Sequence, residues 1–228
     1  MPGRTKVEVR RSRVRRDLAH CAVTLMTEKG FDATTVAEIA SAADYHPSSF
    51  FRYFATKEEA VFLGVPEATE EFRAACAGVR RGDDAWPVVR DAVVAAVANF
   101  TEADPDFFAA QFALWLTDPA LQGPMATNLL KWEEIIAATF ATAGGRKQAD
   151  LYCHVVGGAI VSSLRACVYA HGQERDSFTD RVARAIALLE QGLRRPGGRQ
   201  AGAGTLAVAE KTMSSATSAR REARRSPR

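Results

Sequence analysis

Cysteine is scarce in this sequence of 228 residues. It has four cysteines, and no two of them form a C-x-x-C pair. Three lie within apolar helical patterns, so we expect buried, reduced thiols. A metal site on one predicted helix is the alternative, but a straight helix cannot easily wrap four ligands around a zinc ion. The sequence therefore predicts neither a metal nor a cofactor. The four candidate ligands of that alternative are Cys153, His154, Cys167 and His171.

Long hydrophobic runs are also missing. The best candidate, residues 151–164, has 14 uncharged residues and ends at Arg165, whereas a bilayer-spanning helix needs about 20. The N-terminus is basic, but no apolar signal core follows it. Because 47% of the residues are hydrophobic, we expect a globular, cytoplasmic protein.

Strand signals are absent as well. No stretch combines sustained alternation with β-branched residues and hairpin turns. Leu18, Ala22 and Leu25 instead recur at three- and four-residue steps before a stop at Lys29-Gly30, which predicts a helix. The pattern as a whole predicts an all-α fold. Further helices are expected at about 36–42, 47–53, from Thr56 onward, 67–80, 85–102, 105–116, 119–142, 146–171 and 177–194.

The net charge of +3 conceals parts of opposite sign. Residues 1–16 carry a net charge of +6 and residues 196–228 one of +5, whereas residues 17–195 carry −8. With an acidic body, any contact with nucleic acid must be local, through the N-terminal arm and one face. The segment 196–228 lacks apolar periodicity, and we expect a disordered tail. Its basic residues either aid solubility or bind a partner.

Three short predicted helices between residues 17 and 63 form a helix-turn-helix pattern, with the tight turn at residues 43–45. The last of these helices must grip the core with one face and present small polar side chains to a groove with the other. Phe50 and Phe54 lie four residues apart and are expected to point inward. The side chains expected on the opposite side are Ser48, Ser49 and Arg52.

At residues 25–61 the sequence reads LMTEKGFDATTVAEIASAADYHPSSFFRYFATKEEAV. This stretch resembles the DNA-binding domain of the TetR family of bacterial regulators. The matching pieces are the EKGF turn, the TTVAEIA helix and the FFRYFATKEEAV run, in order and at the right spacing. The resemblance covers residues 17–63, about a fifth of the chain.

The resemblance implies DNA contacts at particular positions. Thr35 would begin the second helix against a phosphate, and Tyr53 and Lys57 would bind phosphates, Lys57 aided by the N-terminus of its helix. The residues implied to open the recognition helix in the major groove are His46, Pro47, Ser48 and Ser49.

The sequence departs from the family pattern at three positions. Phe51 stands where tyrosine is usual, so one hydroxyl contact to phosphate is absent. Asp44 replaces the usual turn glycine, and aspartate tolerates left-handed backbone geometry. His46 stands where a serine cap is common; it either caps the helix or, when protonated, adds a DNA contact.

The segment 17–63 itself has three positive and seven negative side chains. That balance is unfavourable for DNA binding alone. We expect the arm of residues 1–16 to compensate by lying along phosphates or in a minor groove.

Residues 64–195 are expected to form a helical domain that binds a ligand and dimerises, as the resemblance implies. The run VVRDAVVAAVANF at residues 88–100 predicts a nearly all-buried helix. Aromatic residues with a few polar groups follow it, which suits an apolar small molecule, although each can also be ordinary core. The candidate ligand contacts are Phe107, Phe108, Gln111, Phe112, Trp115, Asn128, Trp132, His154 and Arg165.

A looser similarity concerns the ligand. The runs RYFATKEEAV, WLTDPAL and KWEEIIAATFA resemble a subgroup of the family that senses acyl-CoA-like ligands. In such a pocket Arg165 would pair with a carboxylate or phosphate; an intersubunit salt bridge is the alternative.

In the family, the last two long helices carry the dimer interface. Small residues at 157–159 would let helices approach closely. A two-fold dimer would set two recognition helices roughly 34 Å apart, matching successive major grooves of a palindromic site. The residues expected to supply apolar area are Ile160, Leu164, Ile186 and Leu189.

The sequence therefore predicts a homodimeric transcriptional regulator, most often a repressor in this family, which a small apolar effector releases from a palindromic operator. Ligand entry is expected to tilt the fourth helix near Phe62 and Pro66. Two other classes stay open. One is a nucleoid or scaffold protein that binds DNA without a ligand. The other is a helical enzyme, against which count the lack of paired carboxylates, a nucleophile elbow and a phosphate loop.

Overall fold

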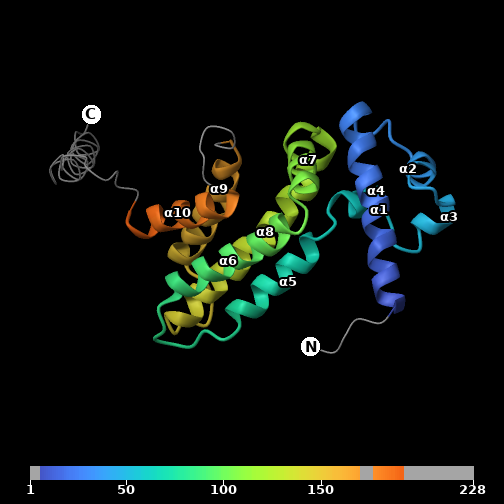
Figure 1. Ribbon diagram of the computed structural model, residues 1–228. Helices are drawn as coiled ribbons and strands as arrows, with labels where there is room; N and C mark the ends of the chain where they lie inside the picture. Colours follow the sequence, from blue (N-terminus) through green and yellow to red (C-terminus); the bar gives the residue numbers. More distant parts are fainter. Residues whose placement is uncertain (1–5, 170–176, 193–228) are drawn as a thin grey trace, which may run out of the picture. The chain divides into compact units, whose positions relative to one another are not determined.

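The chain is helical throughout the part that the structure describes. The computed structural model describes residues 6–169 and 177–192, and every regular element there is an α-helix, as the sequence predicts (Figure 1). The expected disordered tail, the first residues of the arm and His171 lie outside these ranges. The helices are α1 (Lys6–Lys29), α2 (Val36–Ala42), α3 (Pro47–Phe50), α4 (Lys57–Val61), α5 (Val65–Cys76), α6 (Ala85–Glu102), α7 (Pro105–Thr117), α8 (Pro119–Ala143), α9 (Leu151–Tyr169) and α10 (Phe178–Glu190).

The basic segment before residue 17 is helical from Lys6 onward and continues into α1 without a break. We had expected a separate arm over residues 1–16. Arginine and lysine are good helix formers, and no glycine or proline interrupts the segment after Gly3. Its positive charges are therefore carried on a helical surface.

α3 is shorter than the predicted 47–53, because it ends at Phe50. The Arg52 and Tyr53 amides donate hydrogen bonds to carbonyls only three residues back, at 3.2 and 2.9 Å. This tighter winding brings Phe54 under Phe50, and both rings are buried. The residues after α3 thus form a turn.

Most helices of the larger part begin and end close to where the sequence places them, but α5 and α10 each end four residues before the predicted 80 and 194. α6 has its predicted bounds, and α7 and α8 end one residue beyond theirs. α5 begins at Val65, because Pro66 takes a first-turn position, where its missing N–H costs nothing. α9 begins at Leu151 instead of 146. Asp150 caps it by accepting a backbone N–H at 3.1 Å.

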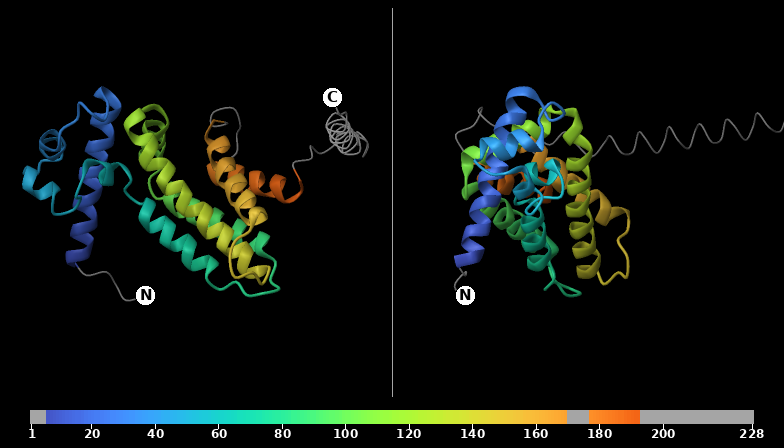
Figure 2. Two further views of the ribbon diagram at one scale, coloured as in Figure 1. Left: turned by 180° about the vertical axis from the view of Figure 1, so that it is seen from behind. Right: turned by 90° about the vertical axis from the view of Figure 1, so that its right-hand side faces the viewer.

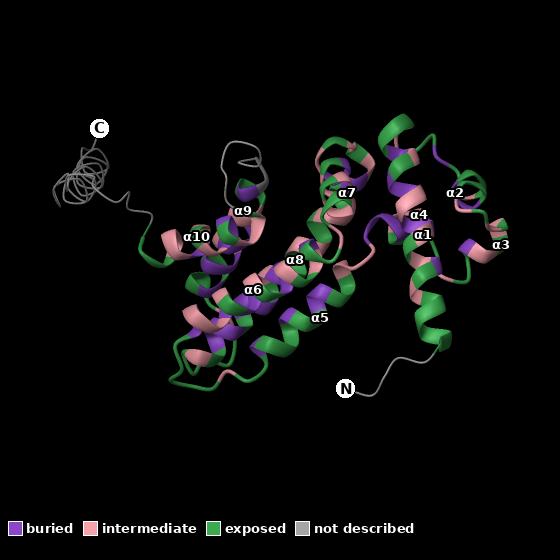
Figure 3. Ribbon diagram, in the orientation of Figure 1, coloured by how far each residue is buried: buried purple, intermediate pink, exposed green. Residues whose placement is uncertain are grey.

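Two clusters of buried side chains form the core (Figure 3). The first belongs to α1–α4 and is completed by Leu114 and Trp115 of α7 and Leu121 of α8. The second lies among α5, α6, α8, α9 and α10. Phe100, near the end of α6, packs against both clusters. The two parts are therefore joined through apolar side chains.

The helices of the second cluster pack on one another. α9 lies along α8, and α10 packs against α9 and α6 (Figure 2). Within the residues described, no helix is both long enough and apolar enough to cross a lipid bilayer.

Candidate functional site

The N-terminus of α2 is held by a complete capping box, as the sequence predicts. Thr35 Oγ1 accepts a hydrogen bond from Glu38 N at 3.3 Å, and Glu38 Oε2 accepts one from Thr35 N at 2.9 Å. Lys29 Nζ lies 2.5 Å from Glu38 Oε1. The hydrogen bonds from Lys29 and then from Thr35 lower the pKa of Glu38 to about 2. The first turn of α2 is thus fixed to the end of α1.

The turn before α3 has left-handed geometry at Asp44, with φ at 60°. The expectation that aspartate would serve there in place of glycine is confirmed. His46 then caps α3, its Nδ1 accepting a hydrogen bond from Ser48 N at 3.3 Å and lying 2.8 Å from Ser48 Oγ. Of the two roles open to His46, the structure therefore has the cap.

The outward side of α3 and the following turn is polar, with one exposed ring. Ser48 and Arg52 are exposed, and Phe51 is 61% exposed. Ser49 and Pro47 are half-buried. These side chains point away from the core that holds Phe50 and Phe54, so the predicted two-sided segment is present.

Lys57 is engaged within the chain. Its Nζ donates hydrogen bonds to Phe31 O at 2.7 Å and to Thr34 O at 3.1 Å, and lies 4.1 Å from the centroid of the Phe31 ring. No sequence pattern indicates these contacts, because both carbonyls are more than twenty residues away. Lys57 thereby fixes the loop that carries Thr35 onto α4.

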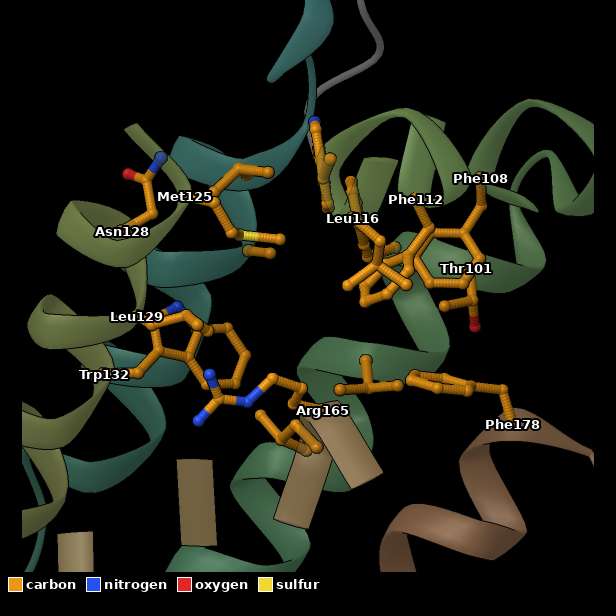
Figure 4. Close-up of a pocket in the computed structure, with 16 residues that line it drawn as sticks. Thr101, Phe108, Phe112, Leu116, Met125, Asn128, Leu129, Trp132, Arg165 and Phe178 are labelled. Carbon is orange, nitrogen blue, oxygen red and sulfur yellow. The ribbon is translucent and has the colours of Figure 1, made fainter. Parts of the chain in front are cut away.

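The larger part contains an apolar cavity of about 130 Å³ (Figure 4). Six of the nine side chains proposed from sequence as ligand contacts line it: Phe108, Phe112, Trp115, Asn128, Trp132 and Arg165.

The other three proposed contacts lie elsewhere. Phe107 stacks on His20 of α1, with ring centroids 4.3 Å apart. Gln111 is fully buried and bonded to carbonyls beside α4. His154 is exposed on α9. In each case the helix turns the side chain to a different face from the one that lines the cavity.

Sequence reasoning missed several walls of the cavity. Phe100 ends the apolar run that was interpreted only as a buried helix, and Phe178 begins α10. Ala68 and Leu129 are small or aliphatic residues indistinguishable in sequence from ordinary core. The one available signal was the aromatic side chain of Phe100 at the end of that run.

Two polar groups around the cavity are satisfied within the chain, whereas Trp115 Nε1 is buried without a hydrogen-bond partner. Trp132 Nε1 donates to Thr69 Oγ1 at 2.9 Å. Asn128 donates to Pro124 O at 3.2 Å. Arg165 is exposed and has no ion-pair partner among the residues described. The cavity is therefore an apolar chamber with a free guanidinium among its lining residues.

α7 touches the helix-turn-helix part at both of its ends. At its start, Asp104 Oδ2 lies 2.9 Å from His20 Nε2 of α1, next to the Phe107–His20 stack. At its end, Asp118 Oδ2 accepts a hydrogen bond from Phe31 N at 2.8 Å. The contacts recur at helical spacing, so they lie along one face of α7.

The middle of the same face holds the segment after α4. Gln111 Nε2 donates to Val61 O at 2.5 Å and to Leu63 O at 3.2 Å. Trp115 stacks on Phe62, with centroids 5.0 Å apart and planes 10° from parallel.

The adjacent face of α7 lines the cavity with Phe108, Phe112 and Leu116. Trp115 stands at the border and belongs to both faces. One helix thus joins the cavity wall to α1, α4 and the loop before α2.

The residues predicted for a dimer interface lie mainly inside the chain. Ile160 and Ile186 are fully buried in the second core cluster, and Leu164 lines the cavity. A Cβ on Gly157 would lie 2.8 Å from Glu133 O, so the close helix approach joins α9 to α8 of the same chain. The assignment was wrong for Ile160 and Ile186, because they build the core of their own chain; Leu189 is half-buried.

A different side of α9 is apolar and open. Leu151 is 80% exposed, Tyr152 52% and Val155 59%. At Gly158, one turn further on, an added Cβ would meet no atom within 4 Å. Exposed aliphatic side chains at i and i+4 form a stripe along the helix.

The described residues hold no group of three or more potential metal ligands, and their four cysteines are free. Burial raises the pKa of the Cys76 and Cys153 thiols. Protonated thiols are poor nucleophiles and poor metal ligands.

Two models of known families match the chain. Residues 20–61 match the model described as bacterial regulatory proteins, tetR family, and residues 83–194 match the MftR C-terminal domain. TcmR, an HTH-type transcriptional regulator of Streptomyces glaucescens, is 39% identical over 74 residues, which are 32% of this chain and 32% of TcmR. MftR of Mycobacterium tuberculosis, a protein assigned to the regulation of mycofactocin biosynthesis, is 27% identical over 199 residues, covering 86% of this chain and 98% of MftR.

A solved structure shares the fold. FadR of Thermus thermophilus, a TetR family transcriptional repressor in complex with lauroyl-CoA, is 21% identical and covers 82% of this chain and 99% of its own, with a TM-score of 0.51. The family matches cover both the helix-turn-helix part and the larger helical part. The chain belongs to the TetR family of bacterial transcriptional regulators.

Proposed function

We propose that the protein is a ligand-responsive repressor that binds a palindromic operator as a dimer and leaves it when a small apolar effector enters the cavity. The observation that carries the proposal is the double role of α7. One face contacts α1, the loop before α2 and the segment after α4, while the adjacent face lines the cavity.

In this proposal residues 17–63 read the DNA. His46, Pro47, Ser48 and Ser49 enter the major groove at the start of α3, and the turn with Phe51, Arg52 and Tyr53 meets the backbone. Thr35 approaches a phosphate at the N-terminus of α2. Lys57 contributes mainly by holding the loop before Thr35, since two of its donors go to carbonyls.

The basic first turns of α1 supply the missing positive charge. Lys6, Arg10, Arg11 and Arg13 are exposed on this helix. A helix with positive side chains next to an acidic DNA-binding part offsets the negative charge of that part where the protein meets the DNA phosphates. Binding is therefore expected to weaken steeply as salt rises.

The cavity suits an apolar group with an acidic end. A volume of about 130 Å³ is close to that of an engineered cavity of roughly 150 Å³ that holds benzene. A long acyl chain requires the helices to move apart, and such movement is what transmits a signal. Arg165 would bind a carboxylate or phosphate of the ligand, as in an acyl-CoA-like molecule. The lauroyl-CoA complex of the Thermus thermophilus protein supports this ligand class.

Release follows from the contacts of α7. An effector that pushes on Phe108 and Phe112 shifts the helix, and Gln111 and Trp115 carry the shift to the segment after α4. The effector acts only through its higher affinity for the shifted form. In a dimer this changes the spacing of the two α3 helices, which must remain about 34 Å apart to fit the operator.

A substitution that fills the cavity tests this mechanism. In Leu129→Trp the indole occupies the cavity, whereas Leu130→Trp places the same indole on the exposed next residue, which is 55% exposed. With DNA from upstream of the protein's own gene, we expect Leu129→Trp to bind about tenfold more weakly in a fluorescence anisotropy titration. Leu130→Trp should bind as the wild type does.

Three measurements delimit the proposal. Equal affinity of both variants, at unchanged melting temperature, would disconnect the cavity from DNA binding. DNA binding that no lauroyl-CoA concentration weakens would favour the ligand-independent DNA-binding class. Turnover of candidate thioesters by the purified protein would favour the helical enzyme class.

The stripe of Leu151, Tyr152 and Val155 is the proposed dimer contact. Val155→Arg places a charge there and should give a single-chain mass in light scattering, while Gln122→Arg, at an exposed position of α8, should not. A wild-type protein that remains a single chain at micromolar concentration would rule the dimer out.

A further inference from the structure

A second cavity lies between α1 and the junction of α5, α6 and α7. Its volume is about 340 Å³, within the roughly 300–1,000 Å³ typical of ligand pockets. It differs in chemistry from the apolar cavity, because charged and polar side chains form much of its lining. It shares only Ala68 and Phe100 with the lining of the effector cavity.

The two long walls of this cleft carry opposite charges. Ser12, Arg16 and His20 of α1 stand at i, i+4 and i+8 and so form one stripe. Glu67 and Glu71 stand one turn apart on α5. A cationic wall thus faces an anionic wall.

The charges are only partly neutralised within the chain. Arg15 Nη1 lies 3.2 Å from Glu67 Oε1, but Arg15 Nε is buried and has no hydrogen-bond partner. Arg16 has no ion pair among the described residues. Glu71 accepts a hydrogen bond from Asn99 through one oxygen, at 3.1 Å. Donors remain on α1 and acceptors remain on α5.

Apart from the His20–Asp104 contact, the end of the cleft toward α7 is apolar. Leu63, Phe100 and Phe107 contribute aliphatic and aromatic surface there. His20 is occupied by Asp104, at 2.9 Å, and by stacking on Phe107. The free polar groups therefore lie toward Arg16 and Glu71, with apolar surface beyond them.

We propose that this cleft binds a small amphoteric molecule of the α-amino acid class with an apolar side chain. Its carboxylate accepts hydrogen bonds from Arg16. Its ammonium group donates to Glu71 and to the second oxygen of Glu67. Its side chain lies against Phe100 and Phe107.

The charge pattern selects an amphoteric ligand over a singly charged one. A simple anion satisfies α1 but meets the carboxylates of α5 at short range, and a simple cation meets the guanidinium groups. Like charges a few ångströms apart at a protein surface repel strongly enough to cancel the gain from the favourable wall. A ligand with both charges satisfies both walls.

Such a ligand links the DNA-binding part to the larger part, because α1 forms one wall and α5 the other. The ligand favours the arrangement of the DNA-binding part and the larger part in which both walls of the cleft can contact it at once. It therefore changes the affinity for DNA. The site is separate from the apolar effector cavity and serves a second, polar signal.

Binding can be measured on the full-length protein without DNA. The twenty standard amino acids are titrated at millimolar concentrations by calorimetry, together with the matching acids that lack the amine and amines that lack the carboxylate. We expect at least one amino acid with an apolar side chain to bind, and both of its singly charged analogues to bind about tenfold more weakly.

Variants then locate the site. Arg16→Ala and Glu71→Gln should each weaken binding about tenfold. Arg11→Ala on α1 and Glu70→Gln on α5 remove exposed charges outside the cleft and should leave it unchanged.

Three results would overturn the proposal: no binding by any amino acid, equal binding of a singly charged analogue, or undiminished binding by both cleft variants. A failure of DNA binding would leave these titrations unaffected, so the two proposals fail separately.

Discussion

The two core clusters differ in how complete they are. The cluster of α5, α6, α8, α9 and α10 has every buried member within these helices. The cluster of α1–α4 is closed by Leu114, Trp115 and Leu121, which belong to α7 and α8. The DNA-reading part therefore depends on the larger part for its packing, whereas the described core of the larger part does not depend on the DNA-reading part.

This asymmetry gives a physical route for regulation. A helix that completes another domain's core cannot shift without changing the packing there, because buried side chains interdigitate at crystal-like density. α7 is that helix, and its contacts are made through carbonyls and rings rather than surface ion pairs alone. Four substitutions test the asymmetry, from the largest expected effect to the smallest.

Trp115→Ala should lower the free energy of unfolding by about 3–5 kcal/mol. The loss should loosen the packing of the α1–α4 part in particular. Trp115 is 4% exposed and packs in the first cluster. The matched control is Trp132→Ala, because Trp132 is 9% exposed and belongs to the second cluster. Denaturant unfolding gives the free energies, and hydrogen exchange of α1–α4 should speed up more in Trp115→Ala. Equal exchange in the two variants would contradict the dependence.

Gln111→Leu should cost about 1–3 kcal/mol, since it leaves two carbonyls after α4 without their donor. Gln122→Leu changes the same residue type at an exposed position of α8 and should be close to neutral. Chemical denaturation measures both. A neutral Gln111→Leu would show that these hydrogen bonds do not hold α4.

Gly64→Ala should cost about 1–2 kcal/mol, because Gly64 has φ of 90° at the connection between α4 and α5. An added Cβ would also lie 2.8 Å from the ring of Phe100. At Gly78 an added Cβ meets nothing within 4 Å, so Gly78→Ala serves as the control. If the two variants melt at the same temperature, the connection is freer than its geometry indicates.

The smallest effect concerns Glu38 and pH. Its pKa is lowered to about 2, mainly by hydrogen bonds from Lys29 and Thr35. A carboxyl group whose pKa is lower in the folded than in the unfolded protein stabilises the fold at pH values above the unfolded pKa, which is near 4.5 here. This contribution disappears as the pH falls toward 2. The melting-temperature gap between wild type and Glu38→Gln should therefore narrow from about pH 5 to pH 2. Glu28→Gln, at an exposed position of α1, serves as the control. A constant gap for Glu38→Gln would refute the linkage.

The caps and the turn of the helix-turn-helix part could be predicted from sequence, because local chemistry determines them, whereas the length of α3 and the helical start of α1 could not. Thr35 and Glu38 lie three residues apart, as a capping box requires. Asp44 takes the left-handed turn and His46 caps the next helix. Each of these depends on neighbours within a few residues.

Long-range partners escaped sequence reasoning. Lys57 bonds to carbonyls more than twenty residues away, and no spacing pattern reports such a contact. Ile160 and Ile186 were expected in a dimer interface, because an apolar helix face has the same sequence pattern whether its own chain or a partner covers it. For the same reason the residues that line the cavity could not be separated in sequence from those that face elsewhere, such as Phe107 and His154.

Phe100 and Ala68 line both the apolar cavity and the charged cleft, so the two chambers share a partition. A molecule that presses this partition from one side reduces the room available on the other. By thermodynamic reciprocity, each occupant then alters the affinity of the other by the same factor. Transcription would thus answer to the ratio of two metabolites rather than to the amount of either.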